Sequence, residues 1–199
     1  GTSVATIVEA TVDGEVVARF EVSDQIKPTA ASIVAELREL GVRPMIVSGD
    51  AIGPVEYVAG QVGIDVGETR SGVLPGDKLR IVTELQASGA SVAMVGDGVN
   101  DAAALVAADL GIAMGTGTDA AMEAGDLTII SGDLSVVPKA LALSRRTLRI
   151  IRANLFWAFA YNVAALPLAV AGLMNPVLAG LAMALSSAFV VANSLRLRR

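Results

Sequence analysis

The chain has 199 residues, a formal net charge of −5 at pH 7, and neither cysteine nor histidine. Disulfides, thiolate metal sites and imidazole catalysis within the chain are therefore excluded. The charge is unevenly divided, because all 20 acidic residues lie in 1–133 with seven basic ones, whereas 134–199 holds eight basic residues and no acidic one.

The first 133 residues alternate short apolar strands with helices. Residues 4–12 and 15–22 alternate β-branched with polar side chains around Asp13-Gly14, which predicts a β-hairpin. The elements predicted next are helix 28–40, strand 42–47, helix 54–62, helix 75–87, strand 91–95, helix 100–107, strand 110–113, helix 118–123 and strand 127–130. This order indicates an α/β fold with a parallel sheet covered by helices on both faces.

A stretch of 43 residues from Ala153 to Leu195 contains no charged side chain. One membrane-spanning helix needs roughly 20 apolar residues, so the stretch predicts two spans joined by a turn at 172–176. A buried hairpin is the alternative, but so short a chain cannot cover one. Both ends are expected to be cytoplasmic because arginines flank them at 145, 146, 149, 152, 196, 198 and 199. An amphipathic helix from about Leu134 is expected to continue into the first span.

The most informative segment is Gly96-Asp-Gly-Val-Asn-Asp101, which follows the predicted strand 91–95. Open α/β sheets place their sites at the carboxyl ends of strands, where Asp97 and Asp101 would stand four residues apart. Carboxylates of this kind suit Mg²⁺ shared with a phosphate, and the glycines let the backbone approach a ligand closely. The alternative is an ordinary Asp-Gly turn with a helix-capping side chain.

Two further segments fit a site that handles phosphate. Ser48-Gly49-Asp50 closes the predicted strand 42–47, where a hydroxyl and backbone N–H groups can bind phosphoryl oxygens. Lys78 lies in the first turn of helix 75–87, where a cation is poorly placed in the helix dipole and so has another reason to be present. Taken alone, Ser48-Gly49-Asp50 is more typical of an ordinary strand-to-helix turn. Lys78 taken alone is as consistent with a solvated surface lysine as with a phosphate-binding one.

Together these segments resemble the P-type ion-pumping ATPases, whose phosphorylation domain has the haloacid-dehalogenase-like fold. The resemblance covers essentially the whole chain. It implies that Asp97 and Asp101 hold Mg²⁺ while ATP is used, and that 24–28 links back from a nucleotide-binding domain. It also implies catalytic roles for Ser48 (in place of the family's Thr), Gly49, Asp50, Lys78 and Asn100.

One feature of the family is missing, because the chain has no Asp-Lys-Thr-Gly nucleophile motif. We therefore expect the C-terminal portion of a pump, which cannot hydrolyse ATP alone. The expected division is a terminal β-hairpin of the nucleotide-binding domain (1–23), the phosphorylation domain (24–133), a connecting helix (134–152), a transmembrane hairpin (153–195) and a basic cytoplasmic tail (196–199).

Polar residues within the spans point to the ion. Tyr161-Asn162 lies in the first span, and Met183, Ser186 and Ser187 share one helix face in the second. Taken singly, such residues are usually interhelical glue or filler. The combination resembles the copper-exporting class of P-type ATPases, which implies Cu⁺ as the transported ion. A soft thioether and the lack of carboxylates agree with Cu⁺, and Ag⁺ would accept the same ligands.

The resemblance implies a multi-pass protein of the cell membrane, with its soluble domain in the cytoplasm. Its expected partners are the lipid bilayer, the missing N-terminal part of the pump and a copper chaperone; no nucleic-acid partner is expected. Two alternatives stay open. One is a membrane-anchored phosphatase of the same fold, and the other is a non-catalytic partner of a full pump.

Overall fold

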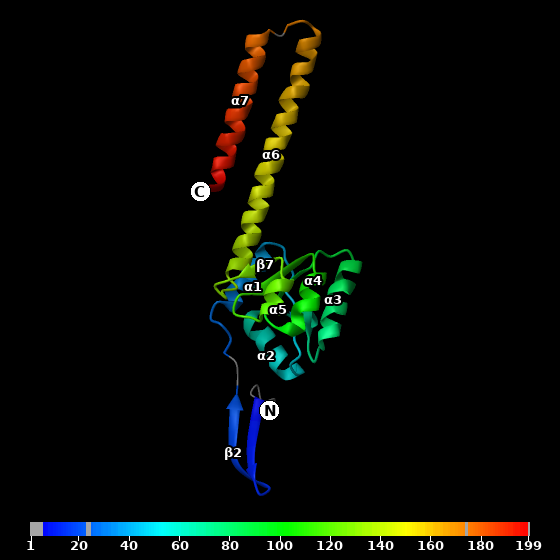
Figure 1. The fold of residues 1–199 in the computed structure, drawn as a ribbon, viewed down its shortest axis with the longest axis vertical. Coiled ribbons are helices and arrows are strands. Elements are labelled where there is room, and N and C mark those ends of the chain that lie inside the picture. Colours follow the sequence, from blue (N-terminus) through cyan, green and yellow to red (C-terminus); the bar gives the residue numbers. More distant parts are fainter. Residues whose placement is uncertain (1–5, 23–24, 174, 199) are drawn as a thin grey trace. The chain divides into compact units, whose positions relative to one another are not determined.

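A computed structural model describes the backbone of residues 6–22, 25–173 and 175–198 (Figure 1). The expected junction residue Asp24 and the start of the first hairpin strand lie outside the described residues. The chain forms two compact units, one ending at Pro138 and the other beginning at Lys139.

The first unit contains every element that the sequence pattern predicts. In chain order these are β1 (Thr6–Val12), β2 (Glu15–Val22), α1 (Ala30–Glu39), β3 (Ile46–Val47), α2 (Ile52–Val62), a 3₁₀ turn (Val66–Glu68), β4 (Thr69–Arg70), α3 (Pro75–Ala87), β5 (Ala93–Gly96), a 3₁₀ turn (Val99–Asp101), α4 (Ala102–Ala107), β6 (Leu110–Met114), α5 (Asp119–Ala124) and β7 (Leu127–Ile129). Two of them, the 3₁₀ turn at 66–68 and β4, had no counterpart in the predicted pattern. The alternation of strands and helices confirms the α/β class.

The hairpin of β1 and β2 turns at Asp13-Gly14, as predicted. Both turn residues have positive φ, +52° and +86°, which is the backbone that a two-residue turn needs to match the strand twist. Val8 faces Phe20 across the ladder, and these side chains are 50% and 56% exposed. A two-stranded hairpin is marginally stable by itself. The exposed apolar side chains of Val8 and Phe20 are therefore suited to packing against another protein segment.

The parallel strands form two ladders instead of the single sheet that we expected. β3 pairs with β4, and β6 lies between β5 and β7. Within the described residues, one edge of β3 and one edge of β5 have no strand partner. The buried strand predicted at 91–95 is consequently half open, since Val95 is 37% exposed while Ile112 on the central β6 is 4% exposed.

Each ladder has its own apolar core. One core gathers Ala59, Val62 and Ile64 against residues of α1 and β3. The other joins Ile112 and Met114 of β6 to β7 and to Leu134 and Val137, at the start of the long helix α6 (Val136–Val170). Helix α4 packs against both α3 and α5 (Figure 1). The 3₁₀ turn that precedes α4 also contacts α3, where its Asp101 meets Lys78 of the first helical turn.

Lys27 links the start of the first unit to its end through a hydrogen bond. The Nζ of Lys27 donates a partly buried hydrogen bond of 2.8 Å to the carbonyl oxygen of Gly132. Gly132 has a φ of +64°, and a Cβ there would come within 2.8 Å of the Thr116 methyl group. The contact holds the segment after β2 against the turn that precedes the long helix α6.

The second unit contains a helical hairpin. α6 (Val136–Val170) runs without a break, as predicted, and α7 (Pro176–Leu195) returns antiparallel to it before a 3₁₀ turn at Arg196–Arg198 (Figure 1). By length and a mean hydropathy of 1.4, α6 is able to cross a membrane, whereas the described apolar part of α7, Ala179–Leu195, is shorter. This architecture agrees with a transmembrane hairpin following an α/β domain.

Candidate active site at the carboxyl end of β5

The two aspartates of the Gly96–Asp101 segment occupy different environments. β5 ends at Gly96, so Asp97 is the first residue beyond the strand, and its side chain is exposed. Asp101 closes the 3₁₀ turn that leads into α4 and is only 7% exposed. One carboxylate therefore faces outward from the strand end while the other lies beneath the turn.

The backbone turn is wrapped around the Asp101 carboxylate. Its Oδ2 accepts long hydrogen bonds from the N–H groups of Asp97 and Gly98, at 3.4 and 3.3 Å. A Cβ at Gly96 would lie 2.6 Å from the Cβ of Asp101, so only glycine fits at the strand end. The requirement for glycine here is a close approach of Asp101 to the backbone and not a positive φ.

Lys78 is paired with Asp101. Its Nζ lies 2.6 Å from Oδ1 of Asp101, and the two side chains are 14% and 9% exposed. α3 begins at Pro75, so Lys78 stands in the first turn of the helix, as predicted. A buried carboxylate needs a partner to stay charged, which explains a cation at a position that the helix dipole disfavours.

The carboxylate of Asp97 is the open one. Within the described residues no group donates a hydrogen bond to it, while both oxygens of Asp101 are engaged. No cluster of three acidic side chains that would enclose a metal occurs in that part of the chain. Mg²⁺ typically takes one or two carboxylates and completes its shell with waters and phosphate oxygens, so the donor set fits this ion.

The predicted phosphate-binding turn follows β3. The Oγ of Ser48 donates to Oδ2 of Asp50 at 2.8 Å and accepts from the Asp50 N–H at 3.2 Å, which makes a closed side-chain turn. The carbonyl of Ser48 also accepts the N–H of Val73 at 3.0 Å. In the described chain no hydrogen bond or ion pair joins Ser48, Gly49 or Asp50 to the Asp97 turn. Asn100 is exposed within the 3₁₀ turn.

A glycine-rich loop that we did not single out contacts this site. It comprises Gly115, Thr116, Gly117 and Thr118, which follow β6, and it is called the 115–118 loop below. The N–H of Thr118 donates to the carbonyl oxygen of Asp97 at 2.9 Å. The sequence could have indicated this loop, because Gly-Thr-Gly-Thr after an apolar strand resembles the Gly-Asp-Gly at 96–98, which also follows a strand.

The predicted ion ligands are not joined to one another. Asn162 donates through Nδ2 to the Ala158 carbonyl of its own helix at 2.7 Å, and Met183 is 67% exposed. Tyr161 and Ser186 are half-buried, whereas Ser187 is exposed. Within the described residues no hydrogen bond links these α6 residues to those of α7.

The two helices are instead joined nearer to their arginine-rich ends. Asn154 accepts a 2.7 Å hydrogen bond from Asn193 and donates one of 3.1 Å to Ser194. Trp157 stacks edge-on against Phe189 at 6.2 Å. Polar pairs of this kind hold transmembrane helices together.

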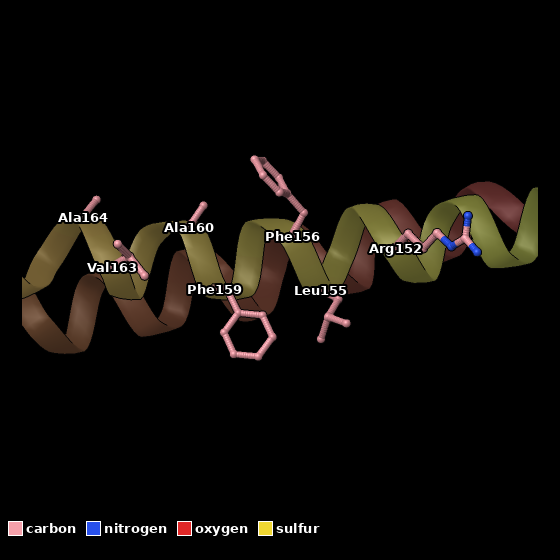
Figure 2. A pocket seen from close by; sticks show the side chains of 7 residues that line it. All are labelled: Arg152, Leu155, Phe156, Phe159, Ala160, Val163 and Ala164. Carbon is pink, nitrogen blue, oxygen red and sulfur yellow. The ribbon is translucent and has the colours of Figure 1, made fainter.

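An open hollow of about 680 Å³ runs along α6, and Figure 2 shows the side chains that line it. They are Arg152, Leu155, Phe156, Phe159, Ala160, Val163 and Ala164. The lining is apolar except for Arg152 and does not include Tyr161 or Asn162. This face suits lipid or further helices and is distinct from the predicted ion ligands.

The chain is similar in sequence to known proteins. Residues 2–109 match the profile of haloacid dehalogenase-like hydrolases. The chain is 51% identical over 193 residues to a cation-transporting P-type ATPase B of Mycobacterium tuberculosis, covering 97% of this chain and 25% of that protein. It is 48% identical over 194 residues to a copper-exporting P-type ATPase of Staphylococcus haemolyticus, covering 98% and 24%.

A solved structure is also similar. A zinc-transporting PIB-type ATPase in its E2.Pi state superposes with a TM-score of 0.87 at 36% identity, covering 99% of this chain and 32% of that one. The chain thus spans about a quarter of the length of the curated relatives that it matches.

Proposed function

Since the chain belongs to the haloacid dehalogenase-like hydrolases, we propose that it is the C-terminal portion of an ATP-driven pump that exports Cu⁺ through an aspartyl-phosphate intermediate. One observation carries the proposal above all. The open carboxylate of Asp97 stands beside a buried Lys78–Asp101 pair, in a chain that continues into an apolar helical hairpin. The similarity to cation- and copper-transporting P-type ATPases over nearly the whole chain supports it.

In this proposal the site handles the phosphoryl group of ATP. Asp97, with the carboxylate of Asp101 behind it, would hold Mg²⁺, which supplies charge neutralisation at the phosphoryl oxygens when bound. Lys78 adds a fixed positive charge at the same place. Ser48, through its hydroxyl, and the backbone N–H groups of Gly49 and Asp50 would hydrogen-bond phosphoryl oxygens. Asn100 lies on the exposed side of the turn and would face the same group.

The nucleophilic aspartate would come from outside the chain. One edge of β5 has no strand partner among the described residues, and this supports the proposal, because a parallel strand paired there would end beside Asp97. The edge of β3 that is unpaired in the described part of the chain would bring such a strand end beside Ser48 in the same way. The missing N-terminal part of the pump is the source of this strand, and the chain alone would hydrolyse no ATP. The exposed Val8 and Phe20 of the hairpin would pack against the same missing part.

The membrane hairpin would carry the ion. Tyr161, Asn162, Met183, Ser186 and Ser187 would coordinate or line the path of Cu⁺, and Ag⁺ fits the same donors. A solved relative transports zinc. We favour copper because the charge-free stretch offers a thioether and no carboxylate. The higher identity to a copper-exporting relative, 48% against 36%, supports this choice.

The proposed location is the cell membrane, with the α/β domain and both ends of the hairpin in the cytoplasm. The arginines that flank the hairpin support this orientation. A chaperone that delivers copper from the cytoplasm is the expected soluble partner. Coupling would pass along α6, which is continuous from Val136 to Val170.

Metal specificity is tested in the full-length protein that contains this chain. We expect Met183→Leu to lower ATP hydrolysis stimulated by Cu⁺, because the substitution removes the thioether donor. Leu185→Met is the matched control, since Leu185 lies on the opposite side of α7 and is exposed to a similar degree, 70% against 67% for Met183. Equal stimulation of wild type and Met183→Leu, or stimulation by Zn²⁺ alone, would contradict the copper assignment.

The coding DNA upstream of Gly1 gives a second test. We expect an in-frame Asp-Lys-Thr-Gly preceded by a Cys-Pro-Cys within a predicted membrane span. A start codon adjoining Gly1 with neither motif would instead favour the anchored domain without catalytic activity.

A further inference from the structure

The main chain of Asp97 is held by a loop that belongs to another strand. The 115–118 loop follows β6, and its Thr118 N–H donates to the Asp97 carbonyl oxygen at 2.9 Å. The N–H of Gly117 donates in turn to the carbonyl of Met114 at 2.8 Å, which closes the loop into a turn. Asp97, which follows β5, is therefore linked to the loop after β6 by a hydrogen bond that lies outside the β5–β6 ladder.

Gly117 lies directly against this carbonyl. A Cβ at Gly117 would overlap the Asp97 carbonyl oxygen and lie 2.8 Å from the Asp97 Cα and 2.9 Å from its carbonyl carbon. All three atoms belong to the backbone, so no side-chain rotation could relieve the overlap. Any residue other than glycine would push Asp97 away or lift the loop.

The loop has its own support on the far side. The N–H of Gly115 donates to the carbonyl of Ile129 at 2.9 Å, and a Cβ at Gly115 would come within 2.7 Å of the Ile130 Cα. Thr118 caps α5, because its Oγ1 accepts the N–H of Ala121 at 3.3 Å and Ala121 is fully buried. Because the 115–118 loop is fixed at both ends, it can hold the main chain of Asp97 in one position.

We propose that Gly117 and Thr118 are positioning residues that aim the Asp97 carboxylate at the bound cation. No group in the described chain donates a hydrogen bond to that carboxylate, so its direction follows from the main chain of Asp97. The inference rests on the proposed function for the identity of the cation. Neither residue touches the phosphoryl group, and both act through Asp97.

The first test uses two neighbouring prolines in the full-length protein. Thr118→Pro removes the N–H donor to Asp97, together with the Oγ1 that caps α5, at a residue whose φ of −81° and ψ of 153° proline tolerates. Thr118→Ala loses only the cap and keeps the N–H, so it separates the two effects and should leave Mn²⁺ binding close to that of the wild type. Asp119→Pro is the control, because Asp119 is the first residue of α5, where proline is favoured and no donor to Asp97 is lost. Mn²⁺ binding, followed by electron paramagnetic resonance, reports the site, and Asp97→Asn defines the signal that belongs to it.

We expect Thr118→Pro to weaken Mn²⁺ binding about tenfold, as is typical when a group that supports a metal ligand is lost, and Asp119→Pro to leave it within about twofold. Gly117→Ala should behave as Thr118→Pro does. Gly111→Ala is its steric control, since a Cβ at Gly111 would approach the Leu105 carbonyl oxygen to 2.6 Å without touching Asp97. Both alanine variants should lower the thermal midpoint, but only the first should lower Mn²⁺ affinity.

Wild-type Mn²⁺ affinity in Thr118→Pro and Gly117→Ala would overturn the inference, and so would an equal loss in Gly111→Ala. The proposed function is judged separately on the same proteins. If the wild type formed no phosphoenzyme with Cu⁺ while the Mn²⁺ pattern held, the pump assignment would fail and the positioning role would stand.

Discussion

Replacing Lys78 by methionine tests how strongly the buried ion pair holds the site together. The pair is short, 2.6 Å, and both side chains are largely removed from water. Methionine keeps most of the side-chain volume but leaves the Asp101 carboxylate with only two long hydrogen bonds from backbone N–H groups. Loss of one partner from a buried pair typically costs about 3–5 kcal/mol.

We expect the lower end of this range, about 3 kcal/mol, because Asp97 and Asn100 beside the pair are exposed and water can reach the vacated space. The local free energy of opening would be read from hydrogen exchange of the α3 and α4 amides in the whole chain in detergent. A loss of 3 kcal/mol corresponds to roughly a hundredfold faster exchange there.

Arg80→Met is the control on the same helix. Arg80 pairs with Asp77 at 3.1 Å and Glu84 at 2.8 Å, but its side chain is 59% exposed, and exposed pairs of this kind contribute little to stability. Asp101→Asn added to Lys78→Met should recover part of the loss by removing the unpaired charge. If Lys78→Met and Arg80→Met accelerated exchange equally, the buried pair would not be the main support of the turn.

Three further substitutions test other contacts. Gly96→Ala should destabilise the first unit by about 2 kcal/mol or more, measured as a lowered thermal midpoint, because its Cβ would overlap that of Asp101; an unchanged midpoint would refute the tight turn. The Val92 N–H and then the Gln86 side chain lower the pKa of Asp109, so its stabilising effect is present above pH 4 and lost as the pH falls further. Asp109→Asn should therefore flatten the acid dependence of the midpoint, and an identical acid profile would count against this. Asn154→Ala should weaken the association of α6 with α7 by about 0.6–1.7 kcal/mol in detergent unfolding, whereas no loss would show that the polar contacts are incidental.

Local signals in the sequence were sufficient for many elements. α3 begins at Pro75 and ends at Ala87 as predicted, because proline suits the first helical turn and Gly89 stops the helix. The hairpin turn at Asp13-Gly14 has the positive φ values that this pair favours. These features depend on residues within a few positions of one another, which a pattern can capture.

Strand pairing was harder to foresee. The predicted strand 42–47 is reduced to Ile46–Val47, and the sheet is divided into two ladders. Strand length depends on the neighbour that supplies hydrogen bonds, and β3 has only β4 beside it in the described chain. An apolar run indicates a strand but cannot tell which edge stays unpaired.

The candidate site residues could be named from the sequence, but their contacts could not. Asp97 and Asp101 were treated alike from their spacing, yet only Asp101 is buried and paired with Lys78. That pair joins residues 23 positions apart and follows from the packing of α3 on α4. The contact of Thr118 with Asp97 likewise depends on β5 and β6 lying side by side.

Phosphorylation of the full-length protein by ATP labelled at the γ-phosphate tests the proposed function as a whole. We expect an acid-stable phosphoenzyme that needs both Mg²⁺ and Cu⁺, is absent in Asp97→Asn and persists in the exposed control Asp119→Asn. Labelling of Asp97→Asn at the wild-type level, or labelling that does not depend on Cu⁺, would show that this chain does not join a phosphoryl site to a copper path.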